Sequence, residues 1–509
     1  MSSKKYNYCI YTPQDVAKDM VKSALDNYFK LGKDEESLRN VRIGDLSCGN
    51  GNLLLEALEE LLKLSKEIIG KYIYLKEWIT GFDINSEAVK LTRIKGRGVL
   101  KKYGINGEVN ILCEDSLQKE GVKFNILLGN PPYLGEKNNK ALFQEIKKTK
   151  LGEKYYEGKM DYFYFFIEKG IELLEESGTL VYLTTNYWLR ADGAKILRST
   201  LRENGEFISI KNYDNSLFCK ATGQHNIIFT WEKNLIENEK IEVQLPEKSF
   251  YIDSENLYDE KEKILLADEE TLKFNKKILK NSNFFLKDLV NINQGIVSGL
   301  DEAYIFDEYR EEFKGYLKPF YKNKDIGKYI TEENKFWILY LDGKVVPDEK
   351  VLNHLEKYRE KLSKRREVTI GRIKWWELQW AREREIFSKP KILVRQRCKT
   401  NQFAYDEREF FGSADIYFIT NKEDNINLFY ILGYMSSEVF LQWFKYNGKI
   451  KGKNYEFYST PLKETPIYYS EDKNEIEYIE KLVKEQIISF SLEREELINR
   501  FFKEKILEK

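Results

Sequence analysis

The sequence lacks several features that would place it in common functional classes. No uncharged apolar run reaches the roughly 18 residues that a membrane-spanning helix requires, and the N-terminus has no apolar segment of the signal-peptide type. Cysteine is sparse and never spaced as CxxC, occurring at Cys9, Cys48, Cys113, Cys219 and Cys398. This argues against a disulfide framework or a zinc site. We expect a cytoplasmic protein that binds no metal and no membrane.

Histidine and proline are also scarce. The 509 residues include two histidines, His225 and His354, which nearly excludes catalysis by a histidine dyad. With nine prolines in the whole chain, two adjacent prolines need an explanation. Hydrophobic residues make up 42% of the chain and aromatic residues 14%, which is enough for two or three domains with large cores.

The net charge is zero, because 83 basic residues balance 83 acidic ones, but the charge is unevenly distributed. The stretch Lys357–Lys399 contains 15 basic and 5 acidic residues, and Lys445–Lys453 contains four lysines and no acid. A local excess of cations can bind a polyanion even in a neutral protein. A charge run is more often a solvated face, so charge alone leaves both interpretations open.

The first 235 residues alternate short β-type runs with amphipathic helical patterns. We expect strands at Val41–Leu46, Trp78–Ile84, Asn110–Cys113, Phe124–Gly129, Thr179–Thr184, Phe207–Tyr213 and Asn226–Trp231, and helices at Leu53–Ile69, Ser86–Tyr103 and Tyr162–Glu175. This alternation is typical of an α/β, Rossmann-like, doubly wound sheet that is mostly parallel. We place this domain at residues 1–240, a connecting segment at 241–282, and an α+β domain ending in helices at 283–509.

Three expected strands of the first domain end in acidic residues. The first ends in Asp45, which is followed by Gly49 and Gly51, the second ends near Asp83, and the third is followed by Asp115. Ligands of doubly wound sheets bind at the carboxyl ends of the strands, and glycine permits close backbone approach. Each feature alone fits an ordinary turn or helix cap. Together they indicate a nucleoside ligand, and the acidic edge favours a cationic sulfonium cofactor over a phosphate.

The fourth strand ends in Asn130-Pro131-Pro132-Tyr133. The exocyclic amine of adenine is a poor nucleophile, because its lone pair is delocalised into the ring. The Asn130 side-chain oxygen and the Pro131 carbonyl can accept hydrogen bonds from this amine and localise its lone pair, while the prolines keep the backbone rigid. Tyr133 offers a ring on which the base can stack. The alternative is a rigid turn without function.

The order of these motifs resembles that of the γ-class adenine-specific DNA methyltransferases, which begin with a motif like Tyr11-Thr12-Pro13. The resemblance implies S-adenosyl-L-methionine as cofactor, with Thr12 and the Asp45–Gly49 loop at its methionine part, Asp83 at its ribose, and Asp115 with Ser116 at its adenine. The cofactor-binding residues expected on this basis are Tyr11, Thr12, Asp45, Ser47, Gly49, Asp83, Ile84, Asp115 and Ser116. The catalytic residues expected are Asn130, Pro131, Pro132 and Tyr133.

Members of this family also clamp the flipped base with a second aromatic residue after a later strand. The segment from Tyr213 to Phe218, followed by His225, matches that pattern and nominates Phe218 for stacking opposite Tyr133. The alternative is a phenylalanine of the core. The segment Asp161–Phe166 matches a helix of the same family, and we expect it to be scaffold.

The C-terminal half resembles the TaqI/Eco57I-type specificity domain, most closely that of the clostridial orphan methyltransferases of the CamA type. The landmarks are Gln294–Gly299, Lys318–Phe320 and the run from Arg365 to Arg382. Cations neutralise phosphates, and Arg and Gln can read base edges. We expect groove contacts from Arg372, Lys374 and Gln379 and phosphate contacts from Arg365 and Arg366. Further DNA-contact candidates are Trp375, Trp376, Arg382, Arg395 and Arg397, with at least one tryptophan in the core.

The expected function is site-specific methylation of the 6-amino group of a flipped-out adenine in double-stranded DNA. We expect a monomer, with a separately encoded restriction endonuclease as a candidate partner. A protein glutamine or RNA guanine-amine methyltransferase shares the Asn-Pro-Pro-Tyr motif, but it has no reason to carry the basic C-terminal domain. A bifunctional restriction–modification enzyme is disfavoured, because ten residues precede Tyr11. A catalytically silent DNA-binding module is disfavoured by the intact motif.

Overall fold

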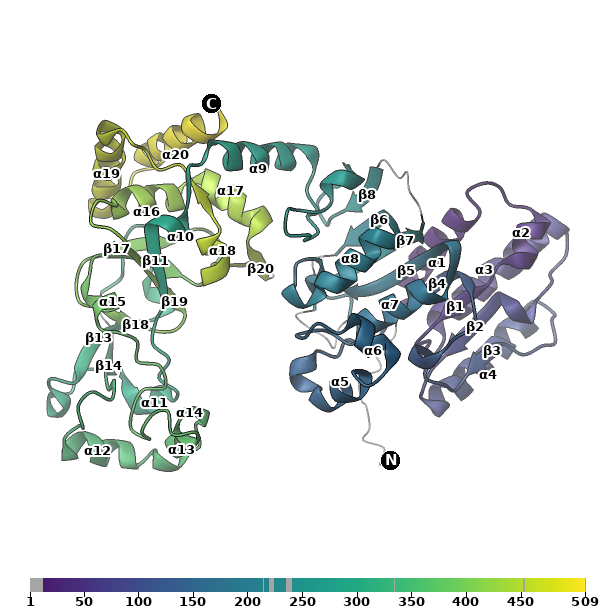
Figure 1. Cartoon of the computed structure of the whole chain (residues 1–509), viewed down its shortest axis with the longest axis horizontal. Coiled ribbons are helices and arrows are strands. Elements are labelled where there is room, and N and C mark those ends of the chain that lie inside the picture. Colours follow the sequence, from purple (N-terminus) through teal and green to yellow (C-terminus); the bar gives the residue numbers. More distant parts are fainter. Residues whose placement is uncertain are drawn as a thin grey trace. The chain divides into compact units, whose positions relative to one another are not determined.

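The computed structural model describes residues 12–213, 215–218, 224–234, 240–333, 335–451 and 454–508. The chain divides into two compact units, Met1–Asp268 and Glu269–Lys509 (Figure 1). The expected connecting segment 241–282 is shared between them. Two of its strands belong to the sheet of the first unit, and its helix α9 (Glu269–Asn281) begins the second unit.

A nine-stranded sheet with the order β3-β2-β1-β4-β5-β7-β6-β8-β9 forms the centre of the first unit. Its strands are β1 (Ile43–Asp45), β2 (Ile79–Phe82), β3 (Asn110–Leu112), β4 (Phe124–Gly129), β5 (Leu174–Thr185), β6 (Gly205–Asn212), β7 (Asn226–Lys233), β8 (Lys240–Gln244) and β9 (Ser249–Asp253). Strands β1 to β5 are parallel, whereas β7 is antiparallel to both of its neighbours. The predicted doubly wound, mostly parallel α/β fold is confirmed.

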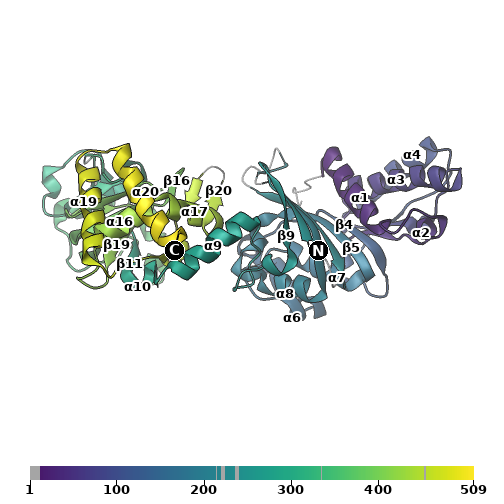
Figure 2. The same cartoon turned by 90° about the horizontal axis from the view of Figure 1, so that it is seen from above.

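Helices cover both faces of this sheet. Successive side chains of a strand point to opposite faces, so strands that are apolar throughout need packing partners on both. Ile126 and Leu128 of β4 join the core that contains α1 (Gln14–Tyr28) and α3 (Asn52–Ile69). Leu127 lies between them and faces Gly170 of α7 (Phe163–Leu173) on the other side, and Figure 2 shows α1 and α7 on opposite sides of the sheet. The other helices of the unit are α2 (Glu35–Asn40), α4 (Ser86–Lys102), α5 (Lys140–Ile146), α6 (Lys150–Tyr155), α7 (Phe163–Leu173) and α8 (Lys195–Asn204).

Most element boundaries follow from local sequence signals. Helix α4 begins at the expected Ser86, because the side chain of Asn85 accepts hydrogen bonds from the first backbone N–H groups of the helix. The main difference lies between α7 and β5. The helix that we expected to reach Glu175 ends at Leu173, because Leu174 already pairs with Phe124 of the neighbouring strand.

The second unit combines several small sheets with helices. The sheets have the orders β11-β19-β15-β17, β12-β14-β13-β18, β16-β21-β20 and β10-β22. Their strands are β10 (Phe284–Phe285), β11 (Val290–Gln294), β12 (Ile305–Phe306), β13 (Leu317–Tyr321), β14 (Phe336–Leu339), β15 (Lys391–Arg395), β16 (Arg397–Cys398), β17 (Phe403–Asp406), β18 (Phe411–Gly412), β19 (Ile416–Asn421), β20 (Lys449–Lys451), β21 (Asn454–Glu456) and β22 (Pro466–Ile467).

The expected C-terminal helices are α19 (Lys473–Ile488) and α20 (Leu492–Leu507), which pack with α16 (Leu428–Ser436) around one apolar core (Figure 1). The remaining helices are α10 (Leu286–Leu289), α11 (Asp301–Tyr304), α12 (Glu349–Glu356), α13 (Arg359–Ser363), α14 (Arg366–Thr369), α15 (Glu385–Ser388), α17 (Glu438–Asn447) and α18 (Ser459–Lys463). Among the described residues, no helix combines the length and the apolar composition that crossing a membrane requires.

Candidate active site and nucleic-acid interface

The turn from β1 into α3 is built on left-handed glycines. Gly49 has φ +51° and Gly51 has φ +81°, a region that side chains other than glycine enter at a cost. A Cβ atom on Gly51 would also clash with the side chain of Thr92 in α4. The Thr92 hydroxyl donates a hydrogen bond to the carbonyl of Gly49 (2.9 Å). Helix α4 therefore fixes the loop at the carboxyl end of the sheet.

The first two acidic strand ends meet at this loop. Asp45 is buried and accepts a hydrogen bond from the backbone N–H of Ser47 (2.9 Å). Asp83 accepts one from Gly49 (2.9 Å) and one from Asn85 (2.7 Å). Burial raises the pKa of Asp45 to about 7, and the charge of Asp83 adds to the rise, while the Ser47 N–H opposes it.

The end of β3 contributes both polar and apolar groups to the same edge. The exposed carboxylate of Asp115 accepts a hydrogen bond from Gln118 Nε2 (2.9 Å). Ser116 is buried, and its hydroxyl donates to the carbonyl of Leu46 (2.6 Å), which ties β3 to the loop after β1. Ile84, after β2, is 74% exposed. An exposed aliphatic side chain near hydrogen-bond acceptors suits contact with a heterocyclic ring.

Strand β4 brings Asn130 to this edge within a network of hydrogen bonds. The Asn130 amide nitrogen donates to the hydroxyl of Thr12 (3.2 Å), and its amide oxygen accepts from the hydroxyl of Tyr133 (2.8 Å). The Tyr133 hydroxyl also lies 3.0 Å from the carbonyl oxygen of Leu183 in β5. Burial, with a contribution from the charge of Asp161, raises the pKa of Tyr133 well above its usual value. Its phenol therefore remains a neutral donor.

The segment Asp161–Phe166, which we expected to be scaffold, contacts the Asn130–Tyr133 turn and stabilises it. Leu134, directly after the turn, donates its N–H to the carboxylate of Asp161 (2.8 Å), and its carbonyl accepts from Tyr162 (3.1 Å). The Tyr133 ring meets the ring of Phe163 edge to face, with a centroid separation of 5.6 Å. The turn is thus fixed on both sides, by the sheet and by the start of α7.

A small cavity of about 30 Å³ joins the glycine loop to Asn130. It is lined by Thr12, Asp45, Ser47, Cys48, Gly49, Asn50, Asn52, Leu53 and Asn130. Four of the nine expected cofactor-binding residues therefore lie together with the expected catalytic asparagine. Sequence reasoning missed Asn52, whose side chain donates to the carbonyl of Thr12 (2.8 Å). Its position directly after Gly51, at the start of a helix, was the available signal. Tyr11 lies outside the described residues.

Phe218 is 7% exposed and belongs to the same apolar cluster as Tyr133. Asn226, at the start of β7, is fully buried and accepts a hydrogen bond from the N–H of Leu217 (2.9 Å). The position of Phe218 thus fits the alternative of a core phenylalanine, and its stacking on a base stays a prediction.

The ten nominated DNA-contact residues fall into two groups in the second unit. Four are exposed: Arg366, Arg372, Lys374 and Arg397. The other six are wholly or partly buried: Arg365, Trp375, Trp376, Gln379, Arg382 and Arg395. Trp376, at 5% exposure, is the core tryptophan that we expected.

Arg365 is a correction to the sequence-based expectation of a phosphate contact. Its side chain is buried, and its guanidinium donates to the backbone carbonyls of Ser298 (3.3 Å), Trp375 (2.8 Å) and Glu377 (2.8 Å). A buried charge needs such partners. Arg365 therefore connects the loop at residue 298 with the loop at residues 375–377, and we refer to these bonds as the Arg365 brace.

Three other nominated side chains are also engaged within the unit. The Gln379 amide donates to the carboxylate of Glu367 (3.0 Å). Arg382 donates to the carbonyl of Gly295 (3.1 Å). The guanidinium of Arg395 donates to the amide oxygen of Gln402 (2.9 Å). These bonds argue against the expected role of Gln379 in reading a base in this conformation.

Two of the four exposed cations, Arg372 and Lys374, lie over aromatic rings. The guanidinium carbon of Arg372 is 4.6 Å from the ring centroid of Trp380, and Lys374 Nζ is 5.3 Å from that of Trp376. Nearby cations such as Lys361 are ion-paired with acidic residues. Within the part of the chain that the structure describes, no ion pair involves Arg366, Arg372 or Lys374. Their charge is available to a polyanion.

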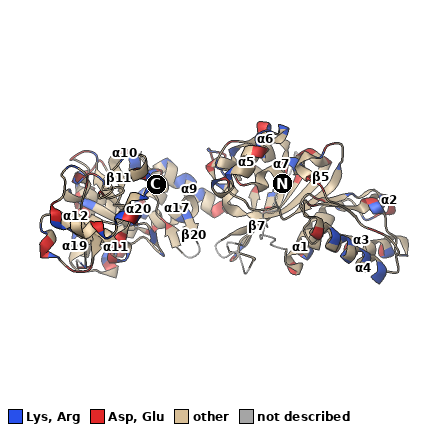
Figure 3. Ribbon diagram, turned by 90° about the horizontal axis from the view of Figure 1, so that it is seen from below, with Lys and Arg blue, Asp and Glu red and all other residues tan. Residues whose placement is uncertain are grey.

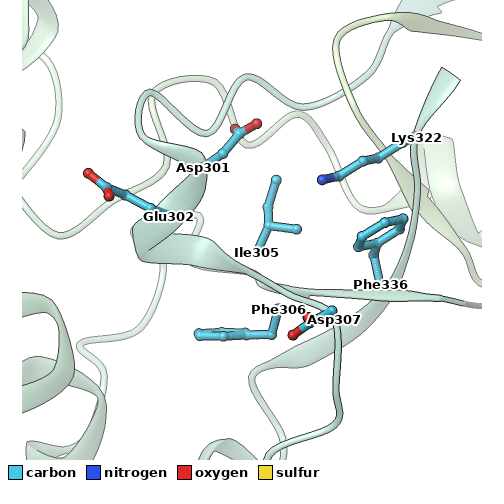
Figure 4. Close-up of a pocket in the computed structure, with 7 residues that line it drawn as sticks. All are labelled: Asp301, Glu302, Ile305, Phe306, Asp307, Lys322 and Phe336. Atoms are coloured by element: carbon cyan, nitrogen blue, oxygen red, sulfur yellow. The ribbon is translucent and has the colours of Figure 1, made fainter.

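Figure 3 shows that both units contain basic and acidic residues. The second unit has a cavity of about 310 Å³ lined by Asp301, Glu302, Ile305, Phe306, Asp307, Lys322 and Phe336 (Figure 4). Three carboxylates and one ammonium group give this cavity a net negative charge. It is therefore unsuited to a phosphate backbone, and it shares no residue with the cavity at Asn130.

Two family descriptions match the chain. "Eco57I restriction-modification methylase" matches residues 48–218, and "TaqI-like C-terminal specificity domain" matches residues 318–467. The first range contains the glycine loop, two acidic strand ends and Asn130–Tyr133, and the second contains Arg365 and the exposed cations. The chain thus carries an Eco57I-type methylase domain and a TaqI-like specificity domain, as the sequence predicts.

Several characterised proteins are similar over most of the chain. The type II methyltransferase M.HindII of Haemophilus influenzae is 24% identical over 389 residues, which cover 68% of this chain and 74% of the relative. M.BanIII of Aneurinibacillus aneurinilyticus is 23% identical over 495 residues, covering 83% and 82%. The DNA complex of the type IIL restriction–modification enzyme MmeI has a TM-score of 0.67 at 13% identity, covering 97% of this chain and 73% of that one. The family matches and the two sequence relatives support a methyltransferase of the type II restriction–modification kind, and the likeness to the MmeI structure shows the fold.

S-adenosyl-L-methionine is the cofactor of this protein, and the residues at the strand ends fit it. Asp83 and Asp115 provide carboxylate acceptors for hydroxyl and amino groups, and the exposed Ile84 provides an apolar contact. The buried carboxyl group of Asp45 lies where a cationic ligand would favour its ionised form. Glycine-loop backbone groups at Gly49 complete the site.

The buried Asp45 predicts a pH-dependent stability in the absence of cofactor. The folded state binds the Asp45 proton more tightly than the unfolded state, so the free energy of unfolding falls as the pH rises from about 4 to about 7. Asp45→Asn keeps an acceptor for the Ser47 N–H and removes this titration. We expect its melting temperature to exceed that of the wild type at pH 8 and to match it near pH 4. The control is Asp15→Asn on the exposed face of α1, and an equal gain in that variant would contradict the prediction.

The contacts of Thr12 predict that it orients Asn130 as well as bordering the cofactor. Thr12→Val removes the hydroxyl that faces the Asn130 amide, so the single-turnover rate of methyl transfer should fall at least about tenfold at saturating cofactor. Cofactor affinity, measured by calorimetry, should change much less, and Thr12→Ser should restore the rate. A variant that binds the cofactor weakly but transfers at the normal rate would instead make Thr12 a cofactor contact alone.

Proposed function

We propose that this restriction–modification methyltransferase is a site-specific DNA adenine methyltransferase, acting on the 6-amino group of an adenine extruded from duplex DNA. The observation that carries the proposal is the position of Asn130, whose side chain lines the same cavity as Asp45 and the glycine loop. The TaqI-like specificity domain at residues 318–467 supports DNA as the substrate. A glutamine or RNA methyltransferase would leave that domain without a role.

The Asn130–Tyr133 turn activates the target amine through hydrogen bonds. An amide oxygen has two lone pairs, and the Tyr133 hydroxyl occupies one of those on Asn130. The second lone pair accepts a hydrogen bond from the adenine amine, and the carbonyl of Pro131 accepts another. Pro131 and Pro132 hold these acceptors in place, because their φ angles are fixed. The amine nitrogen then has its lone pair available for attack.

Bound S-adenosyl-L-methionine would supply an electrophilic methyl group on its positively charged sulfur, with neutral S-adenosylhomocysteine as the leaving group. The target nitrogen becomes cationic on gaining the methyl group and then releases one proton to solvent. No side-chain base is required for this step. The carboxylates of Asp45 and Asp83 would hold the cationic cofactor at the strand ends, beside the glycine loop.

The target adenine must leave the base stack to reach Asn130, at a cost of a few kcal/mol. The partly exposed ring of Tyr133 stacks on one face of the base. Phe218 stacks on the other face after moving out of the apolar cluster that it shares with Tyr133. Each stacking contact returns about 1–3 kcal/mol.

The second unit positions the duplex through its exposed cations. Arg366 contacts phosphate, and Arg372 and Lys374 reach the groove from their aromatic supports at Trp380 and Trp376. We further propose a cytoplasmic monomer with a separately encoded endonuclease as partner, within the CamA-type group that the sequence resembles.

Loss of Asn130 tests this function directly. Asn130→Ala should reduce methyl transfer to DNA about 100-fold or more, because the acceptor for the target amine is lost, while cofactor affinity stays within several-fold. Asn139→Ala, in the loop after the motif, is the matched control. Sequencing of DNA from a host that expresses the wild-type gene, with detection of modified bases, should show N6-methyladenine at one motif. Methylated cytosine, or no modified DNA, would contradict the proposal.

Base extrusion predicts a fluorescence signal that depends on Phe218. A duplex with 2-aminopurine in place of the target adenine should brighten on binding, because the base leaves the stack. Phe218→Ala should lower this signal and the rate of transfer, and Phe218→Tyr should preserve both. If Phe218→Ala changes neither quantity in a folded protein, Phe218 is a residue of the core.

A further inference from the structure

The small sheet β16-β21-β20 of the second unit carries a row of three charged side chains. Arg397 pairs with Glu456, and Glu456 pairs with Lys449 on its other side. Directly opposed residues of antiparallel strands project from the same face of a sheet. The row therefore alternates in sign, with one anion between two cations.

The three side chains differ sharply in exposure. Glu456 has 2% of its side chain exposed, whereas Arg397 has 59% and Lys449 has 58%. Arg397 Nε lies 3.2 Å from one carboxylate oxygen of Glu456, and Lys449 Nζ lies 3.1 Å from the other. The buried anion therefore holds two cations that reach solvent, and the exposed part of the row is positive.

Each cation also has a second contact, with the same aromatic residue. Arg397 Nη2 donates to the hydroxyl of Tyr458 (2.9 Å), and Lys449 Nζ lies 5.3 Å from the centroid of its ring. Burial favours a raised pKa for Glu456, but hydrogen bonds from Lys449 and Tyr458 and the charge of Arg397 lower it overall. Glu456 is thus ionised at neutral pH. Two cations held in this way lose less conformational entropy on binding an anion.

Basic residues predominate in the sequence next to this row, although the exposed carboxylate of Asp415 acts electrostatically on Arg397. Lys445, in the last turn of α17, is exposed, and the sequence Lys445–Lys453 contains four lysines and no acid. Several other exposed cations of the unit pair with exposed acids, as Lys361 does with Glu302. Those acids would repel a polyanion, whereas Glu456 is covered by its own protein. Charge complementarity therefore favours a polyanionic partner at the row.

We propose that Arg397 and Lys449 form a phosphate clamp for duplex DNA, with Glu456 as the positioning residue beneath them. The inference rests on the proposed function, because it takes DNA as the substrate. The clamp contacts the backbone and carries no sequence information. It therefore strengthens binding to any duplex and leaves the reading of bases to other residues of the unit.

The salt dependence of binding tests the clamp. Arg397→Gln and Lys449→Gln should each reduce the slope of log affinity against log salt by about 0.9, and the double variant by about twice as much. Each should weaken binding several-fold, and equally on cognate and scrambled duplexes. Arg397→Lys and Lys449→Arg keep the charge and should retain the slope. Lys503→Gln, on the exposed side of α20, is the matched control and should leave binding unchanged.

Circular dichroism and thermal unfolding should show that each variant is folded. If a glutamine variant is not folded, comparison of the wild type with the charge-preserving variants and with Lys445→Gln still tests whether charge on this face sets the slope. An unchanged slope in folded Arg397→Gln and Lys449→Gln overturns the clamp and leaves the row as an internal brace. Weaker binding to the cognate duplex alone also overturns it, because the residues would then read bases. In both cases the wild-type protein still methylates adenine in DNA. If the proposed function were wrong, the wild-type protein would show no such methylation.

Discussion

The arrangement of the first unit depends on keeping like charges close together at the ends of parallel strands. Backbone N–H groups make this tolerable, because Asp83 accepts two of them and Asp45 accepts one. The N–H of Gly49 joins the ends of β1 and β2 through the carboxylate of Asp83, and the left-handed glycines allow the chain to place it there. Once this edge is set, the parallel strand β4 delivers Asn130 beside it. The turn that we propose as catalytic is thus positioned by the same sheet that gathers the acids.

The second unit handles its excess of cations in two different ways. Some are turned inward, where backbone carbonyls satisfy them, as with Arg365. Others stand on aromatic rings at the surface, as Arg372 does on Trp380. The overall neutrality of the protein hides this division. Its affinity for a polyanion depends on which cations remain exposed, and the net charge does not report that.

Features specified by neighbouring residues were predictable from the sequence. Strand β4 follows from one apolar run ended by Asn130, and α4 begins where Asn85 can cap it. Features specified by distant residues were not. Arg365 is buried because its acceptors come from segments around residues 298, 375 and 377. Strands β8 and β9 join the large sheet through pairing with β6, which no local pattern encodes. The role of Asn52 depends on its contact with Thr12, 40 residues earlier.

The Arg365 brace separates the support of the recognition surface from the surface itself. Its bonds end on backbone carbonyls, which are present whatever the side chains of those residues are. Exposed side chains such as Arg372 and Lys374 can therefore be exchanged without removing any bond of the brace. A fold built in this way can present different combinations of side chains on one unchanged framework. Chains that share the framework can thus diverge in the DNA sequences they recognise while keeping the same architecture.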